Sequence, residues 1–108
     1  SLMDQTEVLF VPTDNTIASS VTLLSELSKE MKIPVVGGSA DMVPKGVLFS
    51  YGTDYEELGR QTAQQALKIL KGKKAKEIPA EYPKALKVVV NDDMAKTLGV
   101  DVSSIKEN

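Results

Sequence analysis

The stretch that decides the fold is GGSADMVPKG, residues 37–46, which joins two short apolar runs. The runs are PVVG at residues 34–37 and VLF at residues 47–49, and each has the composition of a buried strand. The connection contains three glycines and one proline and has no helical period. A parallel crossover within one sheet usually needs a dozen or more residues, most often with a helix. We therefore expect the two strands to pair antiparallel or to lie in different sheets.

The segment before this connection has the pattern of strand, helix and strand. VLFV at residues 8–11 is a continuous apolar run, typical of a strand buried on both faces of a parallel sheet. Apolar residues then recur at spacings of three and four and predict one amphipathic helix of about four turns. These residues are Ile17, Val21, Leu24, Leu27 and Met31. With PVVG as the next strand, this order is the opening of a right-handed parallel crossover.

The segment after the connection predicts a second helix with defined ends. Thr53 and Glu56 have the spacing of a capping box, and Gly72 stands where a helix commonly stops. Between these ends, one face of the predicted helix is formed by Leu58, Thr62, Ala66, Ile69 and Leu70.

The last part of the chain predicts a connector, a strand and a helix. Residues 73–85 contain two prolines and no helical period, so we expect an extended connector. A fourth strand is predicted at residues 86–90, and Asn91 is expected to cap a short helix that ends at Gly99. The class is therefore α/β with a parallel sheet, but two of its connections have no helix.

The composition limits the functions that are open to the chain. Its 108 residues are 42% apolar and 26% charged, as in an ordinary globular domain with one core. The sequence has no cysteine and no histidine, which excludes thiol nucleophiles, imidazole bases and the usual zinc ligands. We predict no catalytic residue, metal site or cofactor. The net charge of −2 would not attract a polyanion, so no nucleic-acid partner is expected. The basic run at residues 71–76 is better explained as a solvated helix end than as a binding patch.

Polar and small residues collect where the predicted strands end. In open parallel sheets, ligands bind beyond the carboxyl ends of the strands. The predicted ligand-binding residues are accordingly Thr13, Asp14 and Asn15 after the first strand, Gly38 and Ser39 after the second, and Tyr51 and Thr53 after the third.

Each of these residues also has a purely structural interpretation. Asp14 could bind an ammonium group through a charge-assisted bond, or it could only cap the following helix. The glycines at 37 and 38 could admit a ligand close to the backbone or simply form a turn. Tyr51 could stack on an aromatic ligand or cover the edge of the sheet. Asp54 and Glu57 are interpreted as helix-start residues that complement the helix dipole. Asp92 and Asp93 are likewise interpreted as acids of a helix first turn and not as a metal pair.

Four stretches together carry a resemblance to a known family. They are FVPTDNTIASS (10–20), IPVVGGSADMVPKG (33–46), YGTDYEELGRQTAQQALKILKG (51–72) and IPAEYPKALKVVVNDDMAKTLGV (78–100). In this order and spacing they resemble the C-terminal part of type I periplasmic binding proteins, and more narrowly the ABC-transporter substrate-binding proteins of tryptophan and tyrosine uptake. The resemblance covers residues 7–100.

The resemblance implies a two-lobed fold with a ligand cleft, of which this chain would hold about the C-terminal third. Residues 7–46 would form a strand-helix-strand piece of the C-terminal lobe and a first hinge crossing. Residues 47–72 would belong to the N-terminal lobe, and residues 73–108 would return through the hinge to the C-terminal lobe. Such a fragment would expose apolar faces, so we expect it to self-associate.

The function that the resemblance implies is that of a non-enzymatic solute receptor. It would capture a small ligand, an aromatic amino acid such as tryptophan, and deliver it to an ABC transporter permease. Its location would be extracytoplasmic, in a periplasm or as a cell-surface lipoprotein. Three alternatives stay open: the ligand-sensing core of a sugar-type regulator, a flavodoxin-like nucleotide-binding enzyme domain, and a pure interaction module. The second alternative lacks support because neither G-x-G-x-x-G nor a P-loop occurs.

Overall fold

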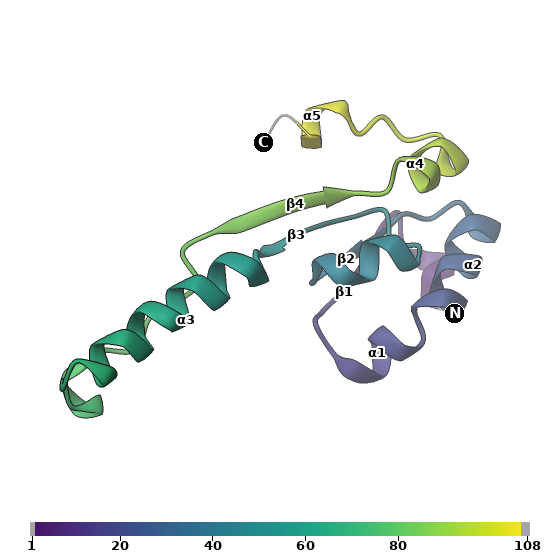
Figure 1. Ribbon diagram of the computed structural model, residues 1–108. Helices are drawn as coiled ribbons and strands as arrows, with labels where there is room; N and C mark the ends of the chain where they lie inside the picture. The colour runs from purple at the N-terminus through teal and green to yellow at the C-terminus, as the bar shows by residue number, and fades with distance from the viewer. Residues whose placement is uncertain (1, 107–108) are drawn as a thin grey trace. The chain divides into compact units, whose positions relative to one another are not determined.

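The computed structural model describes residues 2–106 and contains a four-stranded sheet with helices (Figure 1). In chain order the elements are η1 (Met3–Gln5), β1 (Leu9–Val11), α1 (Asn15–Ser19), α2 (Val21–Met31), β2 (Val35–Gly37), η2 (Ala40–Lys45), β3 (Phe49–Thr53), α3 (Tyr55–Leu70), η3 (Ala75–Glu77), β4 (Leu86–Val90), α4 (Asp92–Leu98) and α5 (Ser103–Lys106), where η denotes a 3-10 helix. The predicted α/β class is confirmed.

The chain divides into two compact units. Within the described residues, the first unit comprises residues 2–52 and 87–106, and the second comprises residues 53–86. The lobe boundaries predicted from the sequence lie after residues 46 and 72. Val47 and Leu48 are buried in clusters of the first unit, which explains why that unit extends beyond residue 46. The assignment of segments to the lobes of a receptor stays a prediction.

The strands on either side of residues 37–46 are parallel neighbours in one sheet. The sheet order is β1-β2-β3-β4, and β2 pairs with β3 in the parallel register Val36↔Phe49 and Gly37↔Ser50. Strand β1 also pairs with β2 in parallel, with Leu9 opposite Val35. The expectation of antiparallel pairing or of separate sheets is therefore wrong.

A short 3-10 helix makes this parallel crossover possible. The η2 helix winds the connection tightly, and its Met42 and Val43 are buried against the sheet. Gly46 then ends the helix with a φ of 121°, a backbone conformation that glycine adopts without strain. The glycines and the proline, which suggested an irregular loop, thus belong to a compact crossover helix and its end.

Strand β4 runs antiparallel to β3. The Asn91 N–H donates to the Leu48 carbonyl at 2.8 Å, and the Asp54 N–H donates to the Ala85 carbonyl at 3.1 Å. Residue numbers rise along one strand as they fall along the other, which is the antiparallel pattern. The sheet is therefore parallel from β1 to β3 and carries one antiparallel edge strand.

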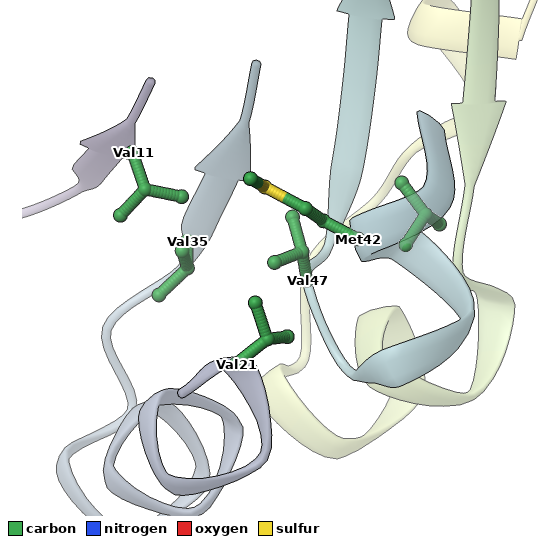
Figure 2. Packing of buried hydrophobic residues seen from close by; sticks show 6 residues of the cluster. Val11, Val21, Val35, Met42 and Val47 are labelled. Carbon is green, nitrogen blue, oxygen red and sulfur yellow. The ribbon is translucent and has the colours of Figure 1, made fainter. Parts of the chain in front are cut away.

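The main core lies between the first strands, α2 and η2. Figure 2 shows side chains from these elements converging on one another, and the buried members are Val11, Val21, Val35, Met42, Val43 and Val47. A second cluster of buried side chains is formed by Leu48, Met94, Ala95 and Val102. Asn91 helps to link the two, because its Nδ2 donates to the Val43 carbonyl at 3.0 Å and its Oδ1 caps α4 by accepting from the Met94 N–H at 2.9 Å. The predicted cap at Asn91 is confirmed.

The first predicted helix is interrupted at Ser20, so it forms α1 and α2 rather than one helix. The hydroxyls of Ser19 and Ser20 both donate to the Thr16 carbonyl, at 2.7 and 3.2 Å. Such local bonds compete with the regular helical ladder. The buried face of α2 also differs from the predicted one, because it includes Ser25 and Ser28 while Leu27 is exposed.

The first strand is buried on one face only. Val11 is buried in the main core, whereas Phe10 remains 65% exposed. The predicted burial on both faces is wrong, because residues 9 and 11 face the core while the alternate residue 10 faces away from it and stays exposed.

The long helix α3 begins one residue later than predicted and has a different cap. The Asp54 Oδ1 accepts from the N–H groups of Glu56 and Glu57 at 3.1 and 3.3 Å, so Asp54 and not Thr53 is the N-cap. Gly72 lies just beyond the helix with a φ of 103°, as expected for a glycine at the helix end. No residue of α3 is buried in the described structure.

The connector after α3 returns along that helix and is held by polar contacts. The Gln61 Nε2 donates to the Glu81 carboxylate at 3.0 Å and to the Tyr82 carbonyl at 2.9 Å. The Lys84 N–H donates to the Gln61 Oε1 at 3.1 Å. Hydrogen bonds from Lys84 and then Gln61 hold the pKa of Glu81 below its ordinary value. These polar contacts hold the connector against α3 in the second unit, where no residue of α3 is buried.

Large apolar side chains of α3 are exposed to solvent, which supports the predicted self-association. Ile69 and Leu70 are 51% and 81% exposed, and an isolated helix of this length is marginal in water. We expect the chain to form dimers or larger species in size-exclusion chromatography with light scattering. Ile69→Lys should shift it toward monomer, while Gln64→Lys on the same helix, with the same charge change, should not. A clean monomer for the unsubstituted chain would contradict the prediction.

Candidate functional site

The carboxyl ends of β1 and β2 meet closely in the first unit. The Gly38 N–H donates to the Val11 carbonyl at 2.8 Å and extends the pairing of the two strands. A Cβ on Gly38 would lie 2.8 Å from the Thr13 nitrogen and 2.9 Å from its Oγ1. Thr13 and Gly38, which the sequence places 25 residues apart, are therefore packed against each other, and only glycine fits at position 38.

The end of β3 adds a second close contact. A Cβ on Gly52 would lie 2.9 Å from the Gly38 carbonyl oxygen, so this strand also depends on glycine to approach its neighbour. Three segments that are distant in sequence thus meet at Thr13, Gly38 and Gly52. The arrangement is the edge at which open parallel sheets bind ligands.

Asp14 caps α1, as one of its two interpretations requires. Its Oδ1 accepts from the N–H groups of Thr16 and Ile17 at 2.8 and 3.0 Å. The side chain is exposed beside Thr13 in the sequence, so its carboxylate is accessible from solvent. Asn15 is the first residue of α1 and is also exposed. A ligand-binding role for Asp14 and Asn15 stays a prediction.

The other predicted residues lie in different surroundings. Ser39 is buried and stands just before η2, and its side chain makes no cap hydrogen bond. Tyr51 and Thr53 are inside β3, not in a loop after it, because the strand runs from Phe49 to Thr53 and not over residues 47–49. Tyr51 is 60% exposed, as a stacking surface requires, whereas Thr53 begins the second unit.

Gly52 was expected with Tyr51 and Thr53 after the third strand, whereas Ser50 was not singled out from the sequence. Ser50 is completely buried, and its hydroxyl is the buried side-chain oxygen without a hydrogen-bond partner in the described residues. Small residues alternating with a tyrosine in SYG were a signal of a tightly packed strand end. The apolar run VLF instead predicted a third strand that ends at Phe49.

The described residues offer neither a metal site nor a membrane span. Among them, no group of three acidic side chains comes together in a way that could hold a metal ion. The helices within residues 2–106 are too short or too polar to cross a bilayer.

Comparison with known proteins shows the family to which the sequence belongs. The sequence model of the ABC transporter substrate binding protein family matches residues 1–106. The chain belongs to this family. A curated relative, the tyrosine-binding protein of Clostridioides difficile (strain R20291), is 37% identical over 98 residues, which is 91% of this chain.

Solved structures of similar proteins share the fold. A ligand-free, open substrate-binding protein with adhesive properties from Clostridium difficile is 39% identical, with a TM-score of 0.78 over 93% of the chain. An ABC domain in complex with L-Trp from Streptococcus pneumonia is 29% identical, with a TM-score of 0.81 over 98% of the chain. The chain spans 28% of the tyrosine-binding protein and 34% and 36% of the two solved chains.

Gly38 provides a test of the close contact at the strand ends. In Gly38→Ala the new methyl group would overlap the Thr13 backbone, so the loop must move at a cost of about 1–3 kcal/mol in the free energy of unfolding. We expect a lower melting temperature and a large shift of the Thr13 amide signal in NMR spectra. Gly59→Ala is the control, because a Cβ there meets nothing within 4 Å. An unchanged Thr13 signal in Gly38→Ala would contradict the described packing.

Proposed function

We propose that this chain is part of the solute-binding component of an ABC importer and contributes one wall of a cleft that captures an aromatic amino acid. It would perform no reaction of its own and would deliver its ligand to a transporter permease. Its proposed location is extracytoplasmic, in a periplasm or at the cell surface as a lipoprotein.

The observation that carries the proposal is the meeting of Thr13, Gly38 and Gly52 at the carboxyl ends of three strands in a chain of this family. Asp14 lies next to this contact, and an exposed carboxylate suits the ammonium group of an amino acid. Tyr51 offers an exposed aromatic face that suits an aromatic side chain. The names of two relatives, one tyrosine-binding and one in complex with L-Trp, favour the same ligand class.

Ligand titration tests the proposal against its alternatives. We expect L-tyrosine or L-tryptophan to raise the melting temperature of the chain and to give a saturable heat signal in isothermal titration calorimetry. D-glucose tests the sugar-sensing core, and ATP tests the nucleotide-binding enzyme domain. Stabilisation by glucose or ATP alone would replace the proposal with the corresponding alternative. Absence of any response would contradict ligand capture by residues 1–108 and favour the third alternative, the pure interaction module.

A further inference from the structure

Helix α3 has large exposed apolar side chains at both of its ends. Tyr55 at its start is 55% exposed, and Ile69 and Leu70 at its end are also exposed. Fourteen and fifteen residues separate them from Tyr55, which is about four turns of an α-helix, so the three side chains lie on one face. Because burial of such side chains is favourable, this apolar face is a candidate surface for a partner.

The connector of the second unit covers the opposite side of α3. The Nε2 groups of Gln61 and Gln65 both donate to the Glu81 carboxylate at 3.0 Å. Gln64 lines a groove together with Gln61 and Glu81, so it faces the connector as well. It is nine residues from Tyr55, which places it about half a turn around the helix. The connector therefore packs away from Tyr55 and leaves the apolar face of α3 exposed.

Charge is divided between the two ends of α3. Glu56 and Glu57 lie in its first turn, whereas residues 68–76, at and beyond its end, contain five lysines and no acidic residue. Two copies of this helix lying side by side in the same direction would bring like charges together. In opposite directions, the acidic start of each helix lies beside the basic end of the other. The charges therefore favour an antiparallel pair, which has the two-fold symmetry that is commonest among homo-oligomers.

We propose that α3 pairs in antiparallel orientation with α3 of a second copy of this chain, across a two-fold axis near the middle of the helix. Tyr55 of each copy packs against Leu70 of the other, and each acidic end meets a basic end. The pairing buries the apolar face of a helix that is marginal on its own in water. The inference goes beyond the proposed function and is independent of it, because it names the surface and the direction of the predicted self-association.

Single cysteines test which ends of the helices meet, because the natural chain contains no cysteine. In the antiparallel pair, position 55 of one copy lies beside position 70 of the other but about 22 Å from position 55 of the other. A disulfide requires Cα atoms within about 7 Å. We expect a mixture of Tyr55→Cys and Leu70→Cys, treated with oxidised glutathione, to give at least about tenfold more disulfide-linked dimer than either variant alone. Non-reducing gel electrophoresis measures the yield.

Gln64→Cys is the matched control. Position 64 is near the middle of α3, where the two copies are at the same level, but it lies on the side that faces the connector. We expect no disulfide-linked dimer of this variant. The three replaced side chains are exposed, so circular dichroism should show the same unfolding temperature for all three variants, and light scattering should show a mass of two chains before oxidation.

Every other outcome contradicts the inference. If Tyr55→Cys or Leu70→Cys alone forms as much linked dimer as the mixture does, the helices do not pair in antiparallel orientation. If Gln64→Cys forms the linked dimer instead, the interface is the other side of α3. If light scattering shows a dimer and the mixture gives no disulfide, the copies associate through another surface. If it shows a monomer, the predicted self-association fails with the inference. None of these results affects the proposed function, which ligand titration tests separately.

Discussion

Replacing Gly46 with alanine should lower the free energy of unfolding by about 3 kcal/mol, the largest loss of stability that we expect from a single methyl group in this chain. Domains of this size have a total stability of about 5–15 kcal/mol, so the melting temperature should fall by more than about 10 °C. Thermal and urea unfolding followed by circular dichroism measure the change.

Two separate effects contribute to the expected loss of stability in Gly46→Ala. Its φ of 121° lies in a region that residues with a side chain rarely adopt. A Cβ there would also lie 2.0 Å from the Ser25 Oγ and 2.4 Å from the Ser25 Cβ. The hydroxyl could rotate away, but the Ser25 Cβ is fixed to a buried position of α2, so the end of η2 would have to move.

Two other glycines separate these effects. Gly99 has a φ of 71° and open space around a Cβ, so Gly99→Ala should cost only the backbone strain, about 1 kcal/mol. Gly59 lies inside α3 with open space, so Gly59→Ala should stabilise the helix by about 0.5–1 kcal/mol. If Gly46→Ala lowers the free energy of unfolding no more than Gly99→Ala does, the contact between η2 and α2 is not as close as described.

Gly46 also shows why part of this fold could not be predicted from the sequence. A cap such as Asp14 or Asn91 bonds to groups two or three residues away, so its role can be seen in a short stretch of sequence. Gly46 meets Ser25, which is 21 residues distant. The sequence of residues 37–46 does not reveal this contact and has the pattern of a loop. The parallel pairing of β2 with β3 was therefore not predicted.

The same reason explains which residues could be predicted to lie at the strand ends. Thr13, Asp14, Gly38 and Ser39 were predicted because the ends of β1 and β2 are marked by polar and small residues within a few positions. The burial of Ser50 depends on residues that are distant in the sequence, which no local pattern reveals. Tyr51 and Thr53 were placed after the third strand because VLF is apolar, but β3 continues through the polar residues that follow.

Replacing Asp14 with asparagine should weaken the binding of L-tyrosine or L-tryptophan by about 10–100-fold and change the melting temperature little. Asparagine is about as good an N-cap as aspartate, and its Oδ1 can still accept from the Thr16 and Ile17 N–H groups. It has no negative charge, however, so the charge-assisted bond to the ammonium group of the ligand is lost. Calorimetric titration and thermal unfolding measure the two effects independently.

Asp54→Asn is the matched control for this prediction. Asp54 caps α3 with the same geometry, its Oδ1 accepting from the N–H groups of Glu56 and Glu57, and it is outside the predicted set of ligand residues. Both asparagine variants lose one charge at a helix start and should unfold at similar temperatures. Only Asp14→Asn should lose affinity. If both variants bind the amino acid as the unsubstituted chain does, the carboxylate of Asp14 contributes a helix cap and no contact to the ligand.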